Sequence, residues 1–286
     1  MSTTRAMNWS IRDRTLSFDS QPLVMGILNV TPDSFYDGGR LSVPSAAIEK
    51  GCRMVDQGAS ILDIGGESTR PGAHEVSTDL ELGRVLPVVT GLRKLLSTVP
   101  LSIDTRHAEV ARMAMEAGAD IINDISALRH DPAMSDVVVS TGAGLVLMHM
   151  KGQPETMQND PQYEHVVQEV REFLGSRIEA AVSLGIRREA LVIDPGIGFG
   201  KTVEHNLDLI AGLDDLLGYG RPVLVGMSRK SFLGAITGRK QEDRLAAGVA
   251  ANVLAALHGA VILRVHDVME TCDALKILDM VSQRRP

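Results

Sequence analysis

Short apolar runs alternate with longer amphipathic segments along most of the chain. The runs are rich in Val, Ile and Leu and are too short for helices, which predicts buried strands. They lie at Leu23–Asn29, Ser60–Ile64, Leu101–Asp104, Ile121–Asp124, Leu145–His149, Leu191–Asp194, Pro222–Ser228 and Val261–His266. Because these runs are apolar almost throughout, they indicate a parallel sheet that is covered on both faces.

Between the runs, apolar residues recur at three- and four-residue spacing, which predicts helices. The helical segments are Ser45–Gln57, Leu80–Leu96, Glu109–Ala117, Tyr163–Ser183 and Arg244–Leu257. Gly58, Gly118 and Gly185 follow three of them, where glycine favours the left-handed conformation that ends many helices. Eight strands with intervening helices fit either a barrel or an open doubly wound sheet, and the strand count favours a (β/α)8 barrel.

The segment before the first strand predicts a small β-hairpin. Trp9, Ile11, Leu16 and Phe18 flank the polar stretch 12–14, and we expect this extension, residues 1–20, to close the lower end of the barrel. About 250 residues is the usual length of such a barrel, and no linker-like stretch divides the chain. We therefore expect residues 1–286 to form a single domain.

Composition excludes several classes of partner. Hydrophobic residues make up 44% and charged residues 23%, as in an ordinary globular protein. The net charge of -7 argues against binding to nucleic acid or to an anionic membrane surface. The two cysteines have no partners at metal-ligand spacing, and neither a signal peptide nor a membrane-spanning run is evident. We expect a cytoplasmic protein.

Polar residues end nearly every predicted strand. In barrels of this type the carboxyl ends of the strands form the active site. These residues are Asn29, Asp104, Asn123, Asp124, Asp194, Ser228, Arg264 and His266. Asp and Asn also cap helices and make turns, which explains any one of them equally well. Burying several unpaired carboxylates costs several kcal/mol in order of magnitude, so the set as a whole favours a bound ligand that pairs with them.

Basic residues gather at the same predicted edge. Arg264 and His266 are two residues apart on a strand and point to the same face. With Arg70 and Lys230 they form a local cationic cluster in an acidic protein, although surface salt bridges are an alternative for each residue alone. Strands seven and eight of such barrels often bind phosphate, and a helix beginning at Ser231 adds N–H donors. This placement favours an oxyanion site.

Two short motifs match other enzymes only in part. The stretch GIGFGKT at 196–202 is similar to a nucleotide-binding P-loop, but the first glycine of that pattern falls on Pro195, which has no N–H to donate. We interpret the stretch as a glycine turn between a strand and a helix. Gly226-Met227-Ser228 lacks the second glycine of a hydrolase elbow.

Eight segments, in order from Val24 to Val268, resemble those of dihydropteroate synthase, an enzyme family of folate biosynthesis. They are NVTPDSF (29–35), GGESTRPG (65–72), SIDT (102–105), IND (122–124), LMHM (147–150), DPGIGFGKT (194–202), SRKS (228–231) and RVHD (264–267). The resemblance implies a transferase that joins 6-hydroxymethyl-7,8-dihydropterin diphosphate to p-aminobenzoate, releasing pyrophosphate and giving 7,8-dihydropteroate. It also implies a homodimer.

The resemblance assigns site residues by position. The pterin is expected to contact Asp104, Asn123, Met148, Asp194, Phe199 and Lys230. The diphosphate is expected to contact Thr69, Arg70, Arg264 and His266. The p-aminobenzoate is expected to contact Phe35, Pro71, Lys230 and Ser231. Asn29 is the expected ligand of Mg2+, and Asp104, Lys230, Arg264 and His266 are the expected catalytic residues.

The residue types suit these roles. A carboxylate such as that of Asp194 accepts paired N–H groups from the pterin edge, and the Asn123 carboxamide both donates and accepts. Mg2+ prefers oxygen ligands and neutralises a departing diphosphate. Loss of pyrophosphate leaves a cation at the pterin methylene carbon, which Asp104 is expected to stabilise and the aromatic amine to trap.

The resemblance has further consequences and alternatives. Sulfonamides mimic p-aminobenzoate and are expected to compete with it, and the loops after the first two strands are expected to close over the substrates. Tyr36 departs from the family pattern, which often has a small residue there. Two alternatives share the pterin-edge residues: a folate-dependent methyltransferase that serves a corrinoid protein, and a non-catalytic pterin-binding barrel.

Overall fold

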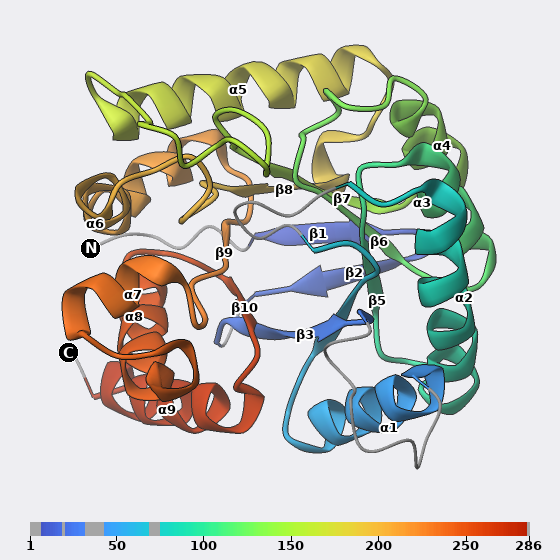
Figure 1. Ribbon diagram of the computed structural model, residues 1–286, viewed down its shortest axis with the longest axis horizontal. Helices are drawn as coiled ribbons and strands as arrows, with labels where there is room; N and C mark the ends of the chain where they lie inside the picture. The colour runs from blue at the N-terminus through green and yellow to red at the C-terminus, as the bar shows by residue number, and fades with distance from the viewer. Residues whose placement is uncertain (1–6, 19–20, 32–42, 69–74, 285–286) are drawn as a thin grey trace.

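The parallel strands form one closed ring in the computed structural model, which describes residues 7–18, 21–31, 43–68 and 75–284 (Figure 1). The strands of these described ranges are β3 (Leu23–Asn29), β4 (Ile61–Gly65), β5 (Leu101–Asp104), β6 (Ile121–Asp124), β7 (Gly144–Met148), β8 (Leu191–Asp194), β9 (Leu224–Val225) and β10 (Ile262–Val265). They pair in the order β8-β7-β6-β5-β4-β3-β10-β9. A parallel bridge between Ile193 and Val223 joins the two ends of this series. The predicted eight-stranded β/α barrel is confirmed.

Strand bounds agree with the sequence pattern to within one residue, except at the seventh predicted strand. Pro222–Ser228 was expected there, but β9 covers only Leu224 and Val225. The chain leaves the ladder at Gly226 and turns, with Lys230 N donating to Met227 O at 3.2 Å and Arg229 at a φ of 60°. This turn brings the side chain of Lys230 to the mouth of the barrel instead of extending the strand.

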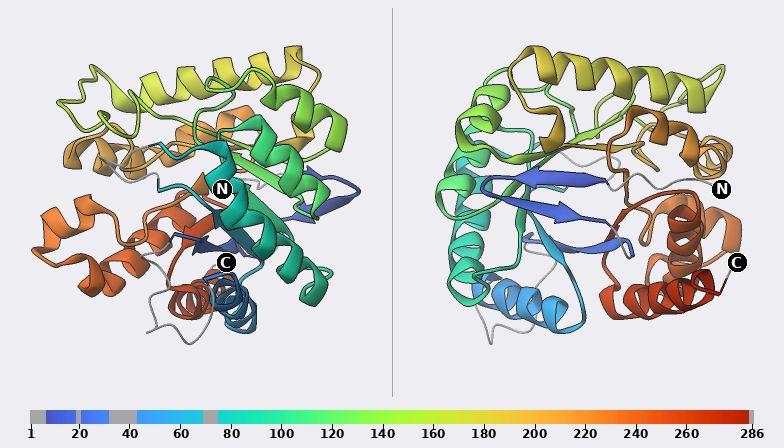
Figure 2. Two further views of the ribbon diagram at one scale, coloured as in Figure 1. Left: turned by 45° about the vertical axis from the view of Figure 1, so that its right-hand side comes forward. Right: turned by 180° about the vertical axis from the view of Figure 1, so that it is seen from behind.

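Helices surround the ring on its outer face (Figures 1 and 2). They are α1 (Val43–Asp56), α2 (Thr78–Leu95), α3 (Ala108–Glu116), α4 (Met134–Thr141), α5 (Val166–Ser183), α6 (Val203–Ala211), α7 (Ser231–Thr237), α8 (Leu245–Leu257) and α9 (Val268–Ser282). Gly58, Gly118 and Gly185 have φ values of 107°, 110° and 91°, as expected for residues that end helices. Tyr163 was expected to open α5, but its hydroxyl donates to Gly200 O at 2.8 Å in the loop before the helix. No helix in the described ranges has the length and apolarity to cross a membrane.

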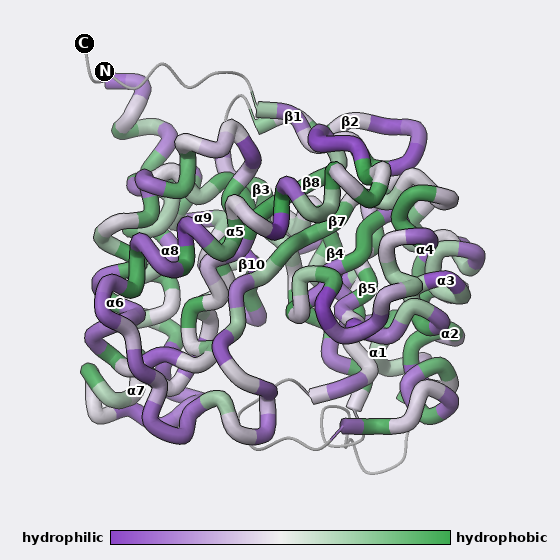
Figure 3. The backbone as a smooth tube through the Cα atoms, turned by 90° about the horizontal axis from the view of Figure 1, so that it is seen from above, coloured by the Kyte–Doolittle hydropathy of each residue, from purple (hydrophilic) through white to green (hydrophobic). Residues whose placement is uncertain are grey.

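The N-terminal hairpin closes one end of the barrel. It consists of β1 (Asn8–Ile11) and β2 (Arg14–Ser17), and Figure 3 shows it at one end of the largely hydrophobic strands. Trp9 and Ile11 are fully buried, and Trp9 Nε1 donates to Ala190 O at 2.8 Å. A Cβ added at Gly144 would lie 2.4 Å from Ile11 Cγ2, so the hairpin packs directly against β7. The predicted hairpin is confirmed.

Seven strands contribute one apolar side chain each to a layer beneath the hairpin. These residues are Met25, Ile61, Ile121, Val146, Val192, Leu224 and Ile262, and they form one cluster with Trp9 and Ile11. Since side chains alternate along a strand, residues two positions further on point into the same interior. The apolar layer therefore supports a second layer nearer the carboxyl ends of the strands.

We expect Trp9→Ala to lower the free energy of unfolding by about 3–5 kcal/mol, because it empties a fully buried site and removes the bond to Ala190. Denaturant unfolding followed by far-UV circular dichroism measures this change. Thr15→Ala, on the exposed side of the same hairpin, is the matched control and should stay within about 0.5 kcal/mol of the parent protein. Equal effects of the two substitutions would contradict the plug role of Trp9.

Candidate active site

A polar layer lies directly above the apolar layer of the barrel. Its members follow Ile61, Ser102, Ile121, Val192 and Ile262 by two residues, so they share the inward face: Asp63, Asp104, Asn123, Asp194 and Arg264. The four acidic and amide side chains are each at most 7% exposed. Because side chains alternate along each strand, several ionisable groups point into one enclosed space, where an unpaired charge is costly.

Arg264 connects two carboxylates across this space. Its Nε donates to Asp63 Oδ2 and its Nη2 donates to Asp104 Oδ2, each at 2.6 Å. Asn123 Nδ2 also donates to Asp63 Oδ2, at 3.1 Å. The second oxygens of the carboxylates, Asp63 Oδ1 and Asp104 Oδ1, are buried and have no hydrogen-bond partner among the described residues. A polar ligand that donates to such oxygens would remove this cost.

Asp63 was missing from the predicted site. It lies in the middle of β4, inside an apolar run, whereas the predicted site residues stand at strand ends. Its alternation with Ile61 was the available signal, because a carboxylate at an inward position of an apolar strand needs a partner. The structure gives it two such partners, Arg264 and Asn123.

Two carboxyl groups of the site, those of Asp104 and Asp194, have raised pKa values. Burial raises the pKa of Asp104 to about 7; the nearby Arg264 opposes this shift and Asp63 adds to it. Two carboxylates share one guanidinium, so the direction follows from charge balance as well as from desolvation. Burial likewise raises the pKa of Asp194, against the opposing charge of Lys230. Such shifts are typical of functional sites.

Lys230 reaches over the glycine-rich loop towards the same space. Its Nζ donates to Ile197 O and lies 4.5 Å from the centre of the Phe199 ring. Burial lowers the pKa of Lys230 to about 8, although Asp194 opposes the shift. Phe199 packs against a buried cluster of Ile125, Met148, Met150 and Met157. The predicted residues Met148 and Phe199 are therefore together, beside the polar layer.

The glycine-rich loop is a tight turn, as predicted, and its lysine points inward. Gly196 and Gly200 have positive φ values, and a Cβ on them would lie 1.9 and 2.4 Å from the carbonyl oxygens of His149 and Lys151. Lys201 is buried, and its Nζ lies 2.9 Å from His149 Nδ1 and donates to Gly196 O at 2.9 Å. The lysine stabilises its own loop and is not placed as the phosphate ligand of a P-loop.

His266 differs from the expected cationic residue. Its backbone N–H donates to Ser228 Oγ at 3.2 Å, and its Nδ1 lies 3.2 Å from the same oxygen. Burial lowers the pKa of His266 to about 3, and the charges of Arg264, Arg229 and Lys50 act in the same direction. The ring is thus neutral near pH 7 and contributes a hydrogen bond, whereas Lys50 of α1 joins the positive groups nearby. Sequence reasoning did not identify Lys50.

Asn29 lies where an oxygen-rich ligand set is possible. It ends β3, next to Gly65 of β4, which in turn pairs with Asp104. A Cβ on Gly65 would lie 3.7 Å from Asn29 Oδ1, so the absence of a side chain there leaves space beside this oxygen, whereas the neighbouring Asp104 Oδ2 already accepts from Arg264. Hard oxygen donors of this kind fit Mg2+.

Of the remaining predicted residues, the structure describes Ser231 and Asp124. Ser231 is exposed and begins α7, directly after Lys230. Asp124, at the end of β6, accepts from Ser126 and Leu128, so its role in the structure is to form a turn. The other four expected ligands, Phe35, Thr69, Arg70 and Pro71, lie outside the described residues, as does Tyr36.

Comparison with known proteins identifies the class. Residues 25–266 match the family described as pterin binding enzyme. Dihydropteroate synthase of Escherichia coli is 45% identical over 260 residues, covering 91% of this chain and 92% of that protein. The enzyme of Mycobacterium leprae is 46% identical and covers 89% and 92%.

Solved structures agree with these relatives. Xanthomonas albilineans dihydropteroate synthase with 4-aminobenzoic acid superposes with a TM-score of 0.92 at 47% identity, covering 99% of this chain and 100% of that one. The same enzyme in complex with 7,8-dihydropteroate gives 0.88 at 45% identity, covering 98% and 100%. The Yersinia pestis enzyme in a sulfonamide drug complex gives 0.91 at 44% identity, with the same coverage.

The chain therefore belongs to the family of pterin-binding enzymes. Within that family its activity is that of a dihydropteroate synthase, a transferase of folate biosynthesis, as the sequence predicted.

The two shifted pKa values predict a bell-shaped dependence of kcat/KM on pH. Activity should rise as Asp104 ionises near pH 7 and fall as Lys230 loses its proton near pH 8. The negative charge of Asp63 raises the pKa of Asp104, so Asp63→Asn should move the acidic limb to lower pH. Steady-state rates measured with one substrate preparation at pH values below, between and above the two pKa values test this.

The control for this profile is Lys230→Arg, which should move only the alkaline limb, to higher pH, because a guanidinium stays protonated. Ionisation of the substrate itself is common to all three proteins and cancels in the comparison. An acidic limb that stays in place in Asp63→Asn would show that Asp104 does not control it.

Proposed function

We propose that this chain condenses 6-hydroxymethyl-7,8-dihydropterin diphosphate with p-aminobenzoate by using the polar layer of the barrel as its pterin site. The observation that carries the assignment is the enclosed set of Asp104, Asn123 and Asp194 beside the apolar wall of Met148 and Phe199. A flat heterocycle with an edge of N–H donors matches this arrangement of acceptors and apolar surface.

The pterin edge is bound by the carboxylates. Asp194 accepts paired N–H groups of the aminopyrimidinone, and Asp104 faces ring nitrogens with its buried, unpartnered Oδ1. Lys230 lies near Asp194 and donates to ring acceptors through Nζ. Because Asn123 and Arg264 already bond to Asp63, they reach the ligand from fixed positions.

The leaving group is bound by the basic side of the site. Arg264 and neutral His266 donate hydrogen bonds to the diphosphate, together with Thr69 and Arg70, which follow β4 in the sequence. Mg2+, held by Asn29 Oδ1 and by oxygens of the substrate, would supply neutralising charge for pyrophosphate.

Departure of pyrophosphate leaves positive charge on the pterin methylene carbon. The C–O bond breaks with its electron pair going to pyrophosphate, and the amine nitrogen of p-aminobenzoate then forms the new C–N bond and loses a proton. The ionised form of Asp104 stabilises the cation electrostatically in this enclosed space. Phe35, Pro71, Lys230 and Ser231 border the p-aminobenzoate ring and its carboxylate.

The alternatives explain less of the site. A corrinoid-dependent methyltransferase needs the pterin-edge residues but has no use for basic groups set around a diphosphate. A non-catalytic pterin-binding protein needs no Asp104 whose pKa lies near neutrality. A homodimeric assembly and a cytoplasmic location remain parts of this proposal, supported by the family resemblance and by the composition.

Turnover is the decisive test. The protein, the pterin diphosphate, p-aminobenzoate and Mg2+ should together yield pyrophosphate and dihydropteroate, detected by a coupled assay and by chromatography. Lys230→Ala and Arg264→Ala should each abolish turnover, because the first removes the donor beside Asp194 and the second leaves Asp63 and Asp104 without their shared cation.

Circular dichroism separates loss of function from loss of fold in these variants, and Lys276→Ala, on the exposed face of α9, is the matched control. Tight pterin binding without any product would favour the non-catalytic alternative. Full activity in Lys230→Ala or Arg264→Ala would contradict the site assignment.

Sulfonamides should inhibit competitively with respect to p-aminobenzoate. The expectation rests on the similar Yersinia pestis enzyme, which is known in a sulfonamide drug complex, and on the chemical likeness of the two ligands. Initial rates at varied p-aminobenzoate and fixed pterin diphosphate should show a raised KM and an unchanged kcat. An absence of inhibition, or inhibition that excess p-aminobenzoate fails to relieve, would argue against a shared subsite.

A further inference from the structure

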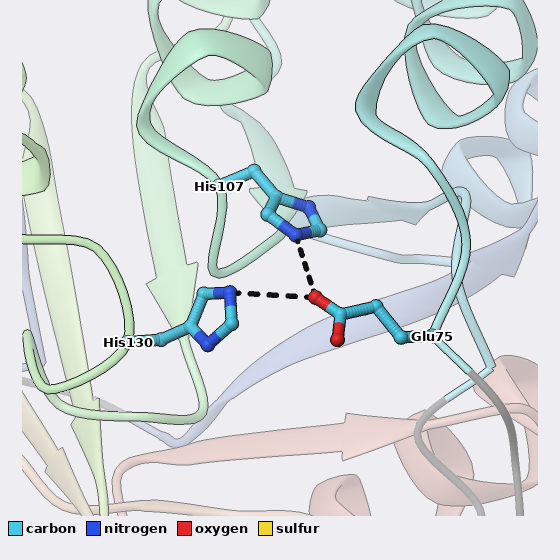
Figure 4. A group of neighbouring side chains, drawn as sticks. All are labelled: Glu75, His107 and His130. Carbon is cyan, nitrogen blue, oxygen red and sulfur yellow. Dashed lines mark hydrogen bonds and ion pairs between the residues drawn. The ribbon is translucent and has the colours of Figure 1, made fainter.

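A cluster of two histidines and a glutamate lies outside the site described above. Glu75 precedes α2, His107 precedes α3, and His130 lies in the connection after β6 (Figure 4). His107 Nε2 is 3.1 Å and His130 Nε2 is 3.5 Å from the same oxygen, Glu75 Oε1. The three ligand atoms all lie within 4.8 Å of one another. They come from three consecutive strand-to-helix connections.

The spacing suits a small dication. Zinc binds histidine nitrogen and carboxylate oxygen at roughly 2.0–2.2 Å in tetrahedral geometry, which places neighbouring ligand atoms about 3.3 Å apart. The two distances to Glu75 Oε1 bracket this value. The side chains of Glu75 and His130 are 53% and 28% exposed, so both can adjust and a metal ion can enter from solvent.

A fourth residue orients the central ligand. His107 Nδ1 is 2.8 Å from Oε2 of Glu81, whose side chain is fully buried. A carboxylate that holds one ring nitrogen and leaves the other facing the ion is the common arrangement around zinc-binding histidines. Glu81 therefore supplies the second-sphere contact that a chance group of surface histidines lacks.

The charges around the cluster also favour a cation. Glu67, Glu75 and Glu81 surround His107. Arg106 is the opposing charge: its Nη2 lies 3.2 Å from Glu67 Oε1 and 3.4 Å from Glu75 Oε1. The alternative is a metal-free cluster in which a proton on His107 Nε2 is hydrogen-bonded to Glu75.

We propose that Glu75, His107 and His130 form a site for a transition-metal dication of the zinc class, with Glu81 as the residue that positions His107. Water completes the coordination, and the proton on His107 Nε2 passes to solvent when the metal binds. The nitrogen-containing ligand set separates this site from the oxygen site at Asn29, which suits Mg2+. Occupancy links the connections that follow β4, β5 and β6, and it stabilises the folded chain.

Titration of the chelator-treated full-length protein with ZnCl2, in buffer containing excess MgCl2, tests the proposal by calorimetry. One equivalent of zinc should bind and raise Tm by about 2 °C or more. CoCl2 should give the intense visible absorption of a four- or five-coordinate site. Histidine NMR signals of His107 and His130 should shift in the unmutated protein, which keeps the test valid if a variant fails to fold.

Variants identify the ligands. His130→Asn should weaken zinc binding at least tenfold, and His107→Asn with His130→Asn should remove the stoichiometric site. Glu81→Gln should weaken it by about tenfold to a hundredfold, as loss of an orienting carboxylate does. His258→Asn, a histidine beside Asp214 at the far end of α8, is the matched control and should bind as the parent does.

Three results would overturn the proposal. They are an absence of stoichiometric zinc binding, binding that survives the double variant, and a loss of binding produced by His74→Asn alone, since His74 is not one of the proposed ligands. Retained pterin turnover in the double variant would leave the enzymatic assignment standing in each case, because none of these residues belongs to the proposed substrate site.

Discussion

The guanidinium of Arg264 is the positive charge that two buried carboxylates, Asp63 and Asp104, share inside the barrel. Without it, Asp63 and Asp104 would be two buried anions with no ion-pair partner, a state that costs several kcal/mol in order of magnitude. Burial, together with the sharing of one cation by two carboxylates, keeps the pKa of Asp104 near 7. The Oδ1 atoms of Asp63 and Asp104 have no hydrogen-bond partner among the described residues. A ligand that carries several N–H donors would supply the hydrogen bonds that these carboxylate oxygens lack.

The apolar layer and the hairpin give that polar layer its rigidity. Trp9 and Ile11 close the end of the barrel opposite the site, so the strands beneath the site are packed on both sides. Asp63, Asn123, Asp194 and Arg264 each follow a residue of the apolar layer by two positions on the same strand. The packing of that layer therefore sets the direction in which these polar side chains point. Catalytic side chains set on such strands are positioned more accurately than those on loops.

Two histidine environments show how burial and partners decide function. Burial, assisted by the positive charges of Arg264, Arg229 and Lys50, lowers the pKa of His266 and leaves its ring as a neutral hydrogen-bonding group. Burial lowers the pKa of His107, but carboxylates on both of its nitrogens outweigh that effect and raise the pKa overall. The first environment suits contact with a diphosphate, whereas the second holds the ring between the carboxylates of Glu81 and Glu75.

The sequence by itself determined the barrel, the hairpin and the family. The spacing of apolar residues and the order of the motifs can be read directly along the chain, without knowledge of tertiary contacts. It also predicted Asp104, Asn123, Asp194 and Lys230 as site residues from their places at or just beyond the ends of predicted strands. Only the tertiary structure decided that Asp63 pairs with Arg264, that Lys201 turns inward, that His266 is uncharged, and that Glu75 meets His107 and His130. These features depend on contacts between residues up to 201 positions apart and on burial, which a linear pattern does not contain.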